Sequence, residues 1–181
     1  MTSKVCLITG VGPGTGSALV RKFAEDYEVA MLARSAERLA ALDAEIPNAH
    51  AYPCDVTDTE HMLAVVAQIR EDLGDPAVVV HNAVGGAFGT FLDIDPDVLE
   101  KNFQINTMSL LHLARATAPA MIAAGEGAIV ITGNTAASRG VANFAGFAPT
   151  KAAQRILGEA MARDLGPKGV HVCLVAIDAV I

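Results

Sequence analysis

The chain has 181 residues, of which 52% are hydrophobic and 18% charged, and its formal net charge is −7. This length predicts a single domain over residues 1–181 with a sizeable core, and the apolar content excludes a disordered chain. The acidic balance argues against nucleic acid as a partner, and no apolar run approaches the roughly 18 residues that a membrane span requires.

Short β-branched runs alternate with longer amphipathic stretches along the whole chain. The short runs predict strands at 5–9, 29–33, 49–53, 78–81, 128–132 and 170–177. The stretches between them predict helices at 16–26, 36–45, 60–72, 96–124 and 149–165. Strands that alternate with helices form βαβ units, so we expect an α/β fold in which helices cover both faces of a parallel sheet.

A glycine-rich turn follows the first predicted strand and leads into the first predicted helix. It reads T-G-x-x-x-G-x-G, carried by Thr9, Gly10, Gly14 and Gly16, with Thr15 inside it. Glycines let the backbone approach a ligand closely, and the N–H groups of the first helical turn can bind a phosphate. The turn therefore predicts a cradle for the pyrophosphate of a dinucleotide. The alternative is a turn that only packs the helix tightly on the strand.

The corner after the second predicted strand favours one of the two nicotinamide dinucleotides. A chain that binds NAD usually places an acidic residue here for the ribose 2′-hydroxyl, but this chain has Ala33. Arg34 offers a planar cation suited to a phosphate and Ser35 offers a hydroxyl, so NADP is favoured over NAD. In the alternative interpretation Ser35 caps the next helix and Arg34 is only solvated.

Two later helices carry start signals. Thr57 and Glu60 form a capping-box pattern before the helix at 60–72, and Asp95 followed by Pro96 predicts the start of the helix at 96–124. The glycine-rich segment 85–89 follows the fourth predicted strand, where open α/β sheets bind ligands.

Cysteine and histidine usage argues against disulfides and metals. The three cysteines are odd in number and far apart, which favours a reducing compartment and hence the cytoplasm; they are Cys6, Cys54 and Cys173. The five histidines show no ligand spacing, so we expect no metal site.

Further motifs make the chain similar to the short-chain dehydrogenase/reductase family over its whole length. Besides the glycine turn, the matching residues are Asp55 and Val56 beside the adenine, Asn82 and Ala83 in a variant of the N-N-A-G motif, Asn106 of the catalytic tetrad, and residues 147–151 on the Y-x-x-x-K motif. The resemblance implies a three-layer, doubly wound parallel sheet, the Rossmann fold, with NAD(P) across the strand ends. It also implies a homo-oligomer, a dimer or tetramer built on two long helices.

The catalytic half of the resemblance is incomplete. Phe147 falls on the position of the family's catalytic tyrosine, and Asn134 falls on that of its serine. The remaining candidates for catalysis are Asn106, Asn134 and Lys151, the last of which also contacts the cofactor ribose in the family. Asn134 could donate a hydrogen bond to an oxyanion, and Lys151 could act through water if burial lowered its pKa.

The resemblance implies hydride transfer between NADPH and a small-molecule carbonyl or alcohol, with an atypical proton donor. Two alternatives stay open: an NADP-binding scaffold that has lost the chemistry, and a lyase or isomerase without net hydride transfer. Ile181 falls where a backbone group of the family meets the nicotinamide amide. Since the sequence stops near the sixth strand, we expect the substrate-covering part to be missing, and the substrate is not specified.

Overall fold

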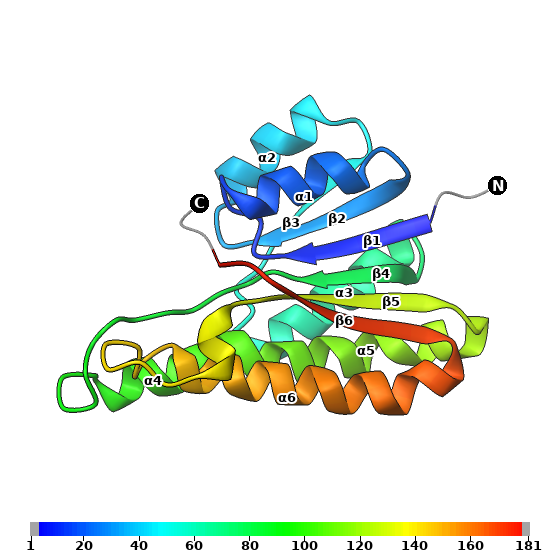
Figure 1. Ribbon diagram of the computed structural model, residues 1–181. Coiled ribbons are helices and arrows are strands. Elements are labelled where there is room, and N and C mark those ends of the chain that lie inside the picture. Colours follow the sequence, from blue (N-terminus) through cyan, green and yellow to red (C-terminus); the bar gives the residue numbers. More distant parts are fainter. Residues whose placement is uncertain (1–3, 179–181) are drawn as a thin grey trace.

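Six parallel strands form one sheet in the order β3–β2–β1–β4–β5–β6 (Figure 1). Their bounds are β1 (Lys4–Thr9), β2 (Tyr27–Ala33), β3 (Ala49–Pro53), β4 (Pro76–His81), β5 (Gly127–Gly133) and β6 (Val170–Ala176). The computed structural model describes residues 4–178. The order confirms the predicted doubly wound fold. It reverses direction between β1 and β4, and ligands bind at such a point, outside the carboxyl ends of the strands.

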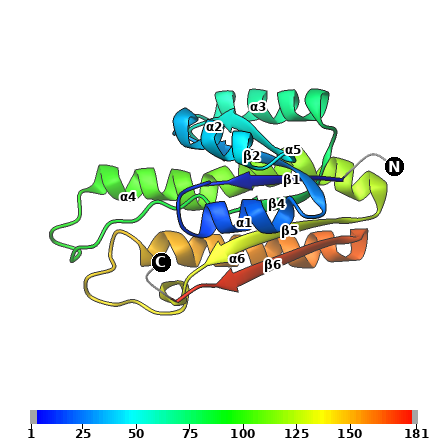
Figure 2. The same ribbon diagram turned by 90° about the horizontal axis from the view of Figure 1, so that it is seen from above.

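Helices cover both faces of the sheet, as Figures 1 and 2 show. Their bounds are α1 (Thr15–Phe23), α2 (Ala36–Glu45), α3 (Thr59–Asp72), α4 (Pro96–Phe103), α5 (Ser109–Ala124) and α6 (Ala148–Leu165). One core packs Ile8 of β1 against α1 and α2, and the other packs Leu7 of the same strand against α3 and α5. Neighbouring residues of one strand thus enter different cores, which explains why the strand runs are apolar almost throughout.

The predicted helix at 96–124 is not one regular helix. Asp95 caps its start by accepting a hydrogen bond from the backbone N–H of Asp97, and Pro96 is its first residue, as the sequence predicts. A π-helical turn, Gln104–Met108, then separates α4 from α5. Such turns are rare and often lie at functional sites, and this one contains Asn106.

The predicted capping box before α3 is wrong by one residue. Asp58 is the N-cap, and its carboxylate accepts the backbone N–H of His61. Thr57 instead donates its backbone N–H and its hydroxyl to Asp55, at 3.0 and 2.8 Å. The Asp55–Thr57 turn thereby fixes the carboxyl end of β3.

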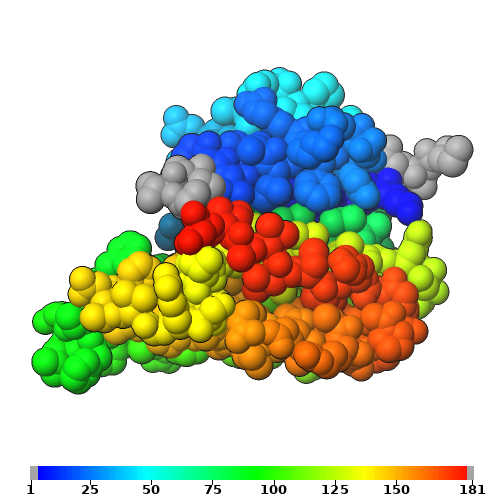
Figure 3. All heavy atoms as spheres, viewed as in Figure 1, coloured from blue at the N-terminus to red at the C-terminus, as the bar shows by residue number. Residues whose placement is uncertain are grey.

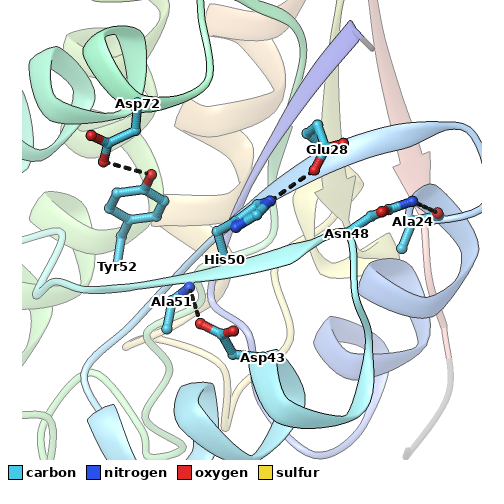
Figure 4. Close-up of polar contacts among 8 residues, drawn as sticks. All are labelled: Ala24, Glu28, Asp43, Asn48, His50, Ala51, Tyr52 and Asp72. Atoms are coloured by element: carbon cyan, nitrogen blue, oxygen red, sulfur yellow. Dashed lines mark hydrogen bonds and ion pairs between the residues drawn. The ribbon is translucent and has the colours of Figure 1, made fainter.

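Polar side chains secure the edge strand β3 (Figure 4). His50 of β3 pairs with Glu28 of β2 at 2.8 Å, and the Tyr52 hydroxyl donates to Asp72 of α3. The backbone N–H of Ala51 donates to the carboxylate of Asp43 in α2. This last contact occupies a donor that a foreign strand would need for edge-to-edge pairing.

Two loops extend beyond the carboxyl end of the sheet, one after β4 and one after β5. A parallel bridge joins Gly89 of the first to Phe144 of the second. In the space-filling view of Figure 3, the green and yellow atoms of these segments form one projecting end of the molecule. Among residues 4–178, no helix has the length and apolar character needed to cross a membrane.

Candidate functional site

A cavity of about 650 Å³ lies at the carboxyl ends of the strands, where the sheet order reverses. Its size suits a small-molecule ligand. Four strand ends and α4 contribute its lining: the glycine turn after β1, Arg34 and Ser35 after β2, Asp55 and Val56 after β3, Asn82 and Ala83 after β4, and Lys101 of α4. Most of the cofactor-binding residues predicted from the sequence therefore meet in one place.

Steric limits in the turn explain two of its glycines. Gly10 has φ +70°, and a Cβ there would lie 2.5 Å from the backbone nitrogen of Ala83. A Cβ at Gly16 would lie 2.6 Å from the carbonyl oxygen of Gly10. Gly14 precedes α1 as its N-cap residue and supplies no side-chain cap, so the start of α1 opens onto the cavity without one. A helix start that is open in this way can bind a phosphate through its free N–H groups.

Thr9 and Asn82 hold the two central strand ends together. The Thr9 hydroxyl accepts the backbone N–H groups of Asn82 and Ala83, each at 3.2 Å, and the Asn82 amide donates to the carbonyl of Gly10 at 2.8 Å. Thr9 is fully buried. We predicted these residues as cofactor ligands, and the structure places Thr9 behind the cavity wall, where it positions the residues that line it.

Positive charge gathers at the β2 end of the cavity. Arg34, Arg38 and Lys101 all line it. Partial burial raises the pKa of Asp55, but hydrogen bonds from Thr57 and the charges of Arg34 and Lys101 outweigh this and hold that pKa below its ordinary value. The cavity lining thus contains three cations and one carboxylate, a balance that suits an anionic ligand.

Ser35 takes the role given by the alternative interpretation, because its hydroxyl caps α2 by accepting the backbone N–H of Arg38 at 3.3 Å. It also lines the cavity. Sequence reasoning missed Arg38 and Lys101. Arg38 lies in the first turn of α2, and the sequence alone does not show that this face of the helix meets the cavity.

At the other end of the site, Asn106 is enclosed by protein contacts. Its amide oxygen accepts the Gly85 N–H at 3.0 Å, and its amide nitrogen donates to the Gly85 carbonyl and the Thr150 hydroxyl, both at 2.7 Å. Asn106 thus ties the π turn to the loop after β4 and to α6. The amide group of Asn106 is engaged, so its visible role is to hold this end of the site in place.

Lys151 is buried in α6, and its ammonium group donates to the carbonyl of Thr132 at the end of β5, at 2.8 Å. Burial lowers its pKa to about 8. The sequence argument required this lowering for any role of Lys151 in proton transfer.

Asn134 lies at the end of β5 and caps the short 3-10 turn Thr135–Ser138. Its oxygen accepts the Ala136 N–H and its amide nitrogen donates to the carbonyl of Ile177, both at 2.8 Å. One amide hydrogen remains for a ligand. Ile181, predicted to meet the nicotinamide, lies outside the described residues.

Phe147 stands at the start of α6, one turn before Lys151. Its ring packs in a cluster with Phe88 and Phe144, and Gly86 approaches it so closely that an added Cβ would lie 3.1 Å from the ring. The cluster brings together three residues from both projecting loops.

A fully buried histidine, His81, lies at the end of β4, next to the residues that line the cavity. The Ser109 hydroxyl donates its one proton to the carbonyl of Ile105, so the Nε2 atom of His81 carries the proton in its 2.8 Å contact with that hydroxyl. The Nδ1 atom then accepts from the Gln154 amide at 3.2 Å. Burial, with the nearby charge of Lys151, lowers the pKa of His81 to about 3.

Comparison with known proteins agrees with this geometry. The family model described as "short chain dehydrogenase" matches residues 4–180. The chain is 30% identical to epidermal retinol dehydrogenase 2 of Mus musculus over 89% of its own length and 54% of that protein. It is 31% identical to D-erythrulose reductase of Gallus gallus over 92% of its length and 67% of that protein. It thus spans between about half and two thirds of these relatives.

Two solved structures superpose closely on the chain. A metagenomic short-chain oxidoreductase in complex with NADP is 30% identical with a TM-score of 0.92, covering 99% of this chain and 84% of that one. An NAD⁺-bound xylitol dehydrogenase is 30% identical with a TM-score of 0.89, covering 97% of this chain and 70% of that one.

Proposed function

The chain belongs to the short-chain dehydrogenase family, and we propose that it is an NADP-dependent oxidoreductase that moves hydride between NADPH and a carbonyl or alcohol. One observation carries this proposal: the glycine turn at Gly10 and Gly16, where no side chain fits, lines the same cavity as Arg34 and Arg38. A dinucleotide phosphate needs both a close backbone approach and positive charge.

The lining residues fit this cofactor in a definite order. The pyrophosphate would lie on Gly10, Gly14, Thr15 and Gly16, and the 2′-phosphate on Arg34, Ser35 and Arg38. The adenine side would face Asp55 and Val56, and a ribose Asn82 and Ala83. Lys151 does not line this cavity; its place at the nicotinamide ribose rests on the resemblance to the family. Bound NADPH supplies the hydride. Since the solved neighbours include one with NADP and one with NAD⁺, the preference for NADP rests on Arg34 beside Ala33.

We further propose that Phe147 occupies the position of the family's catalytic tyrosine. A phenyl ring exchanges no proton, so another group must protonate the oxygen of the reduced carbonyl. Lys151 is the nearest candidate in sequence and its pKa of about 8 suits a donor near neutral pH. The remaining amide hydrogen of Asn134 can donate to the oxygen as it becomes negative, while Asn106 holds Gly85 and Thr150 in place.

The experiment measures cofactor binding and turnover separately. We expect the 181-residue chain to blue-shift NADPH fluorescence and to bind NADPH about tenfold or more tightly than NADH. Arg34→Glu should reverse that preference while leaving NADH binding in place. An absence of any NADPH response at millimolar cofactor contradicts the proposal.

Turnover separates an enzyme from a cofactor-binding scaffold. A steady NADPH oxidation with a carbonyl substrate that Lys151→Met abolishes supports catalysis by this site. NADPH binding that never leads to turnover with any carbonyl supports the scaffold. The relatives do not narrow the choice of carbonyl, because their names refer to retinol in one case and to erythrulose, a sugar, in another.

A further inference from the structure

We propose that the substrate carries an apolar, preferentially aromatic, group that packs on three phenylalanines, Phe88, Phe144 and Phe147. We call these residues the ring cluster. The inference rests on the proposed function, because that function places the reacting carbonyl near Lys151, one helical turn after Phe147. The ring cluster then lies directly beside the reacting end of the substrate.

The two projecting loops hold the ring cluster together. The Gly89 N–H donates to the carbonyl of Asn143 at 2.9 Å, and the Ala145 N–H donates to the carbonyl of Gly89 at 3.3 Å. The ring of Phe88 lies 5.2 Å from that of Phe144, edge to face, and 6.4 Å from that of Phe147. These separations are typical of packed aromatic pairs, so the rings form a set surface rather than three independent side chains.

This surface is open. Phe88 is 73% exposed although its ring touches two others, and Val84 and Val141 of the same two loops are also exposed. A cavity of about 370 Å³, to which Phe144 contributes, lies beside it between residues 136–141 and the first turns of α6. Small apolar residues make up most of the cavity lining, and Arg139 is the one charged residue in it. An apolar group of a substrate could therefore pack against the rings and extend into this cavity.

Three polar side chains nearby, Asn102, Asn106 and Thr90, are already engaged within the protein. The Asn102 amide donates to the carbonyl of Gly146 at 2.8 Å, and the amide of Asn106 is divided between Gly85 and Thr150. The Thr90 hydroxyl donates to Asp93 at 2.6 Å. A site that binds a polyol needs several free donors and acceptors aimed at its hydroxyls. Beside these engaged groups, the ring cluster presents aromatic rings to a ligand.

The test compares an aromatic and a polar carbonyl on the 181-residue chain. Binding of 2-naphthaldehyde and of 1,3-dihydroxyacetone is measured by saturation-transfer NMR, both without cofactor and with saturating NADP⁺, which prevents reduction. We expect the aldehyde to bind at least about tenfold more tightly, since burial of one aromatic face is worth that factor. Equal binding, or tighter binding of dihydroxyacetone, overturns the proposal.

Matched variants locate the binding surface. Phe88→Ala should weaken aldehyde binding about tenfold. Phe88→Leu should retain most of it, because leucine keeps the apolar bulk. Phe91→Ala is the control, because Phe91 is 80% exposed but takes part in none of the ring contacts. Equal losses in Phe88→Ala and Phe91→Ala overturn the proposal. NADPH fluorescence is measured separately, so a loss of cofactor binding counts against the proposed function and not against the ring cluster.

Discussion

The proposed position of Phe147 in the site can be tested by restoring a phenol there. Phe147→Tyr would place a phenol one turn before the Lys151 ammonium, which lowers a phenol pKa by its charge. Because a positioned general acid contributes about 10² to 10⁴ in rate, we expect reductase activity to rise within that range. The measurement is NADPH oxidation at saturating substrate.

Phe144→Tyr is the control for this variant, since it adds a phenol to the same ring cluster outside the turn that precedes Lys151. A similar gain in both variants would show that the phenol acts only through binding. No gain in Phe147→Tyr would show that a phenol at this position does not reach the reacting oxygen, which contradicts the proposal that Phe147 occupies the position of the catalytic tyrosine.

His81 makes folding stability depend on pH. Its pKa is about 3 in the folded protein against an ordinary 6.5, so above pH 6.5 it is neutral in both states and changes nothing. As the pH falls below 6.5, His81 becomes protonated in the unfolded chain but stays neutral in the folded protein. Stability then falls by about 1.4 kcal/mol per pH unit until the pH nears 3.

The variant His81→Asn does not titrate, so its urea unfolding free energy should fall less steeply between pH 6.5 and 4 than that of the parent. Comparing the two slopes removes the contribution of all other groups that titrate in both. Parallel slopes would mean that His81 takes up its proton without unfolding.

Single residues were predictable where chemistry restricts the residue type. The glycine turn and Arg34 were predicted to meet at one site and both line the cavity. Few residue types allow a close backbone approach, and arginine is the residue with a planar cation. Arg38, Lys101 and His81 could not, because their roles depend on which face of an element meets the cavity or core. Which face of an element meets the cavity is decided by how the elements pack in the folded chain.

At the scale of elements, the strands were predicted to within two residues, and the interruption of the long helix was not predicted. The apolar pattern continues through residues 96–124, so periodicity shows one helix. The π turn is fixed by tertiary contacts instead. Asn106 donates to Gly85 and Thr150. The carbonyl of Ile105 accepts from the Ser109 hydroxyl, which His81 also contacts. None of these partners is close in sequence except Ser109.

The start of α1 provides a prediction about its packing. Gly16→Ala should reduce the urea unfolding free energy by about 1–3 kcal/mol, because the new methyl group would collide with the backbone of Gly10 and Val11. Gly12→Ala in the same turn should change it by less than about 0.5 kcal/mol, since no atom lies within 4 Å of a Cβ there. Equal effects of the two substitutions would mean that the turn rearranges, and that close contact does not set the requirement for glycine.

At the scale of the whole molecule, the sheet lies between two hydrophobic cores, and a single strand contributes side chains to both of them. Ile8 contributes to one core and Leu7 to the other, so neither set of helices can detach without uncovering half of β1. This favours the proposal that residues 1–181 form one domain. The cytoplasmic location and the homo-oligomer stay predictions, because they depend on surroundings that a single chain does not contain.

One cooperative domain with its cofactor site at the centre of the sheet should unfold as a unit that NADPH stabilises. At a concentration 100 times Kd the cofactor adds about 2.7 kcal/mol, which in a chain of this size corresponds to a rise in Tm of roughly 5–11 °C. Calorimetry should show a single transition that moves as a whole, because the cavity joins the ends of four strands. Arg34→Glu should lose most of the shift with NADPH and keep the smaller shift with NADH. Two transitions, of which NADPH moves only one, would show that the two cores unfold separately and that the single-domain proposal is wrong.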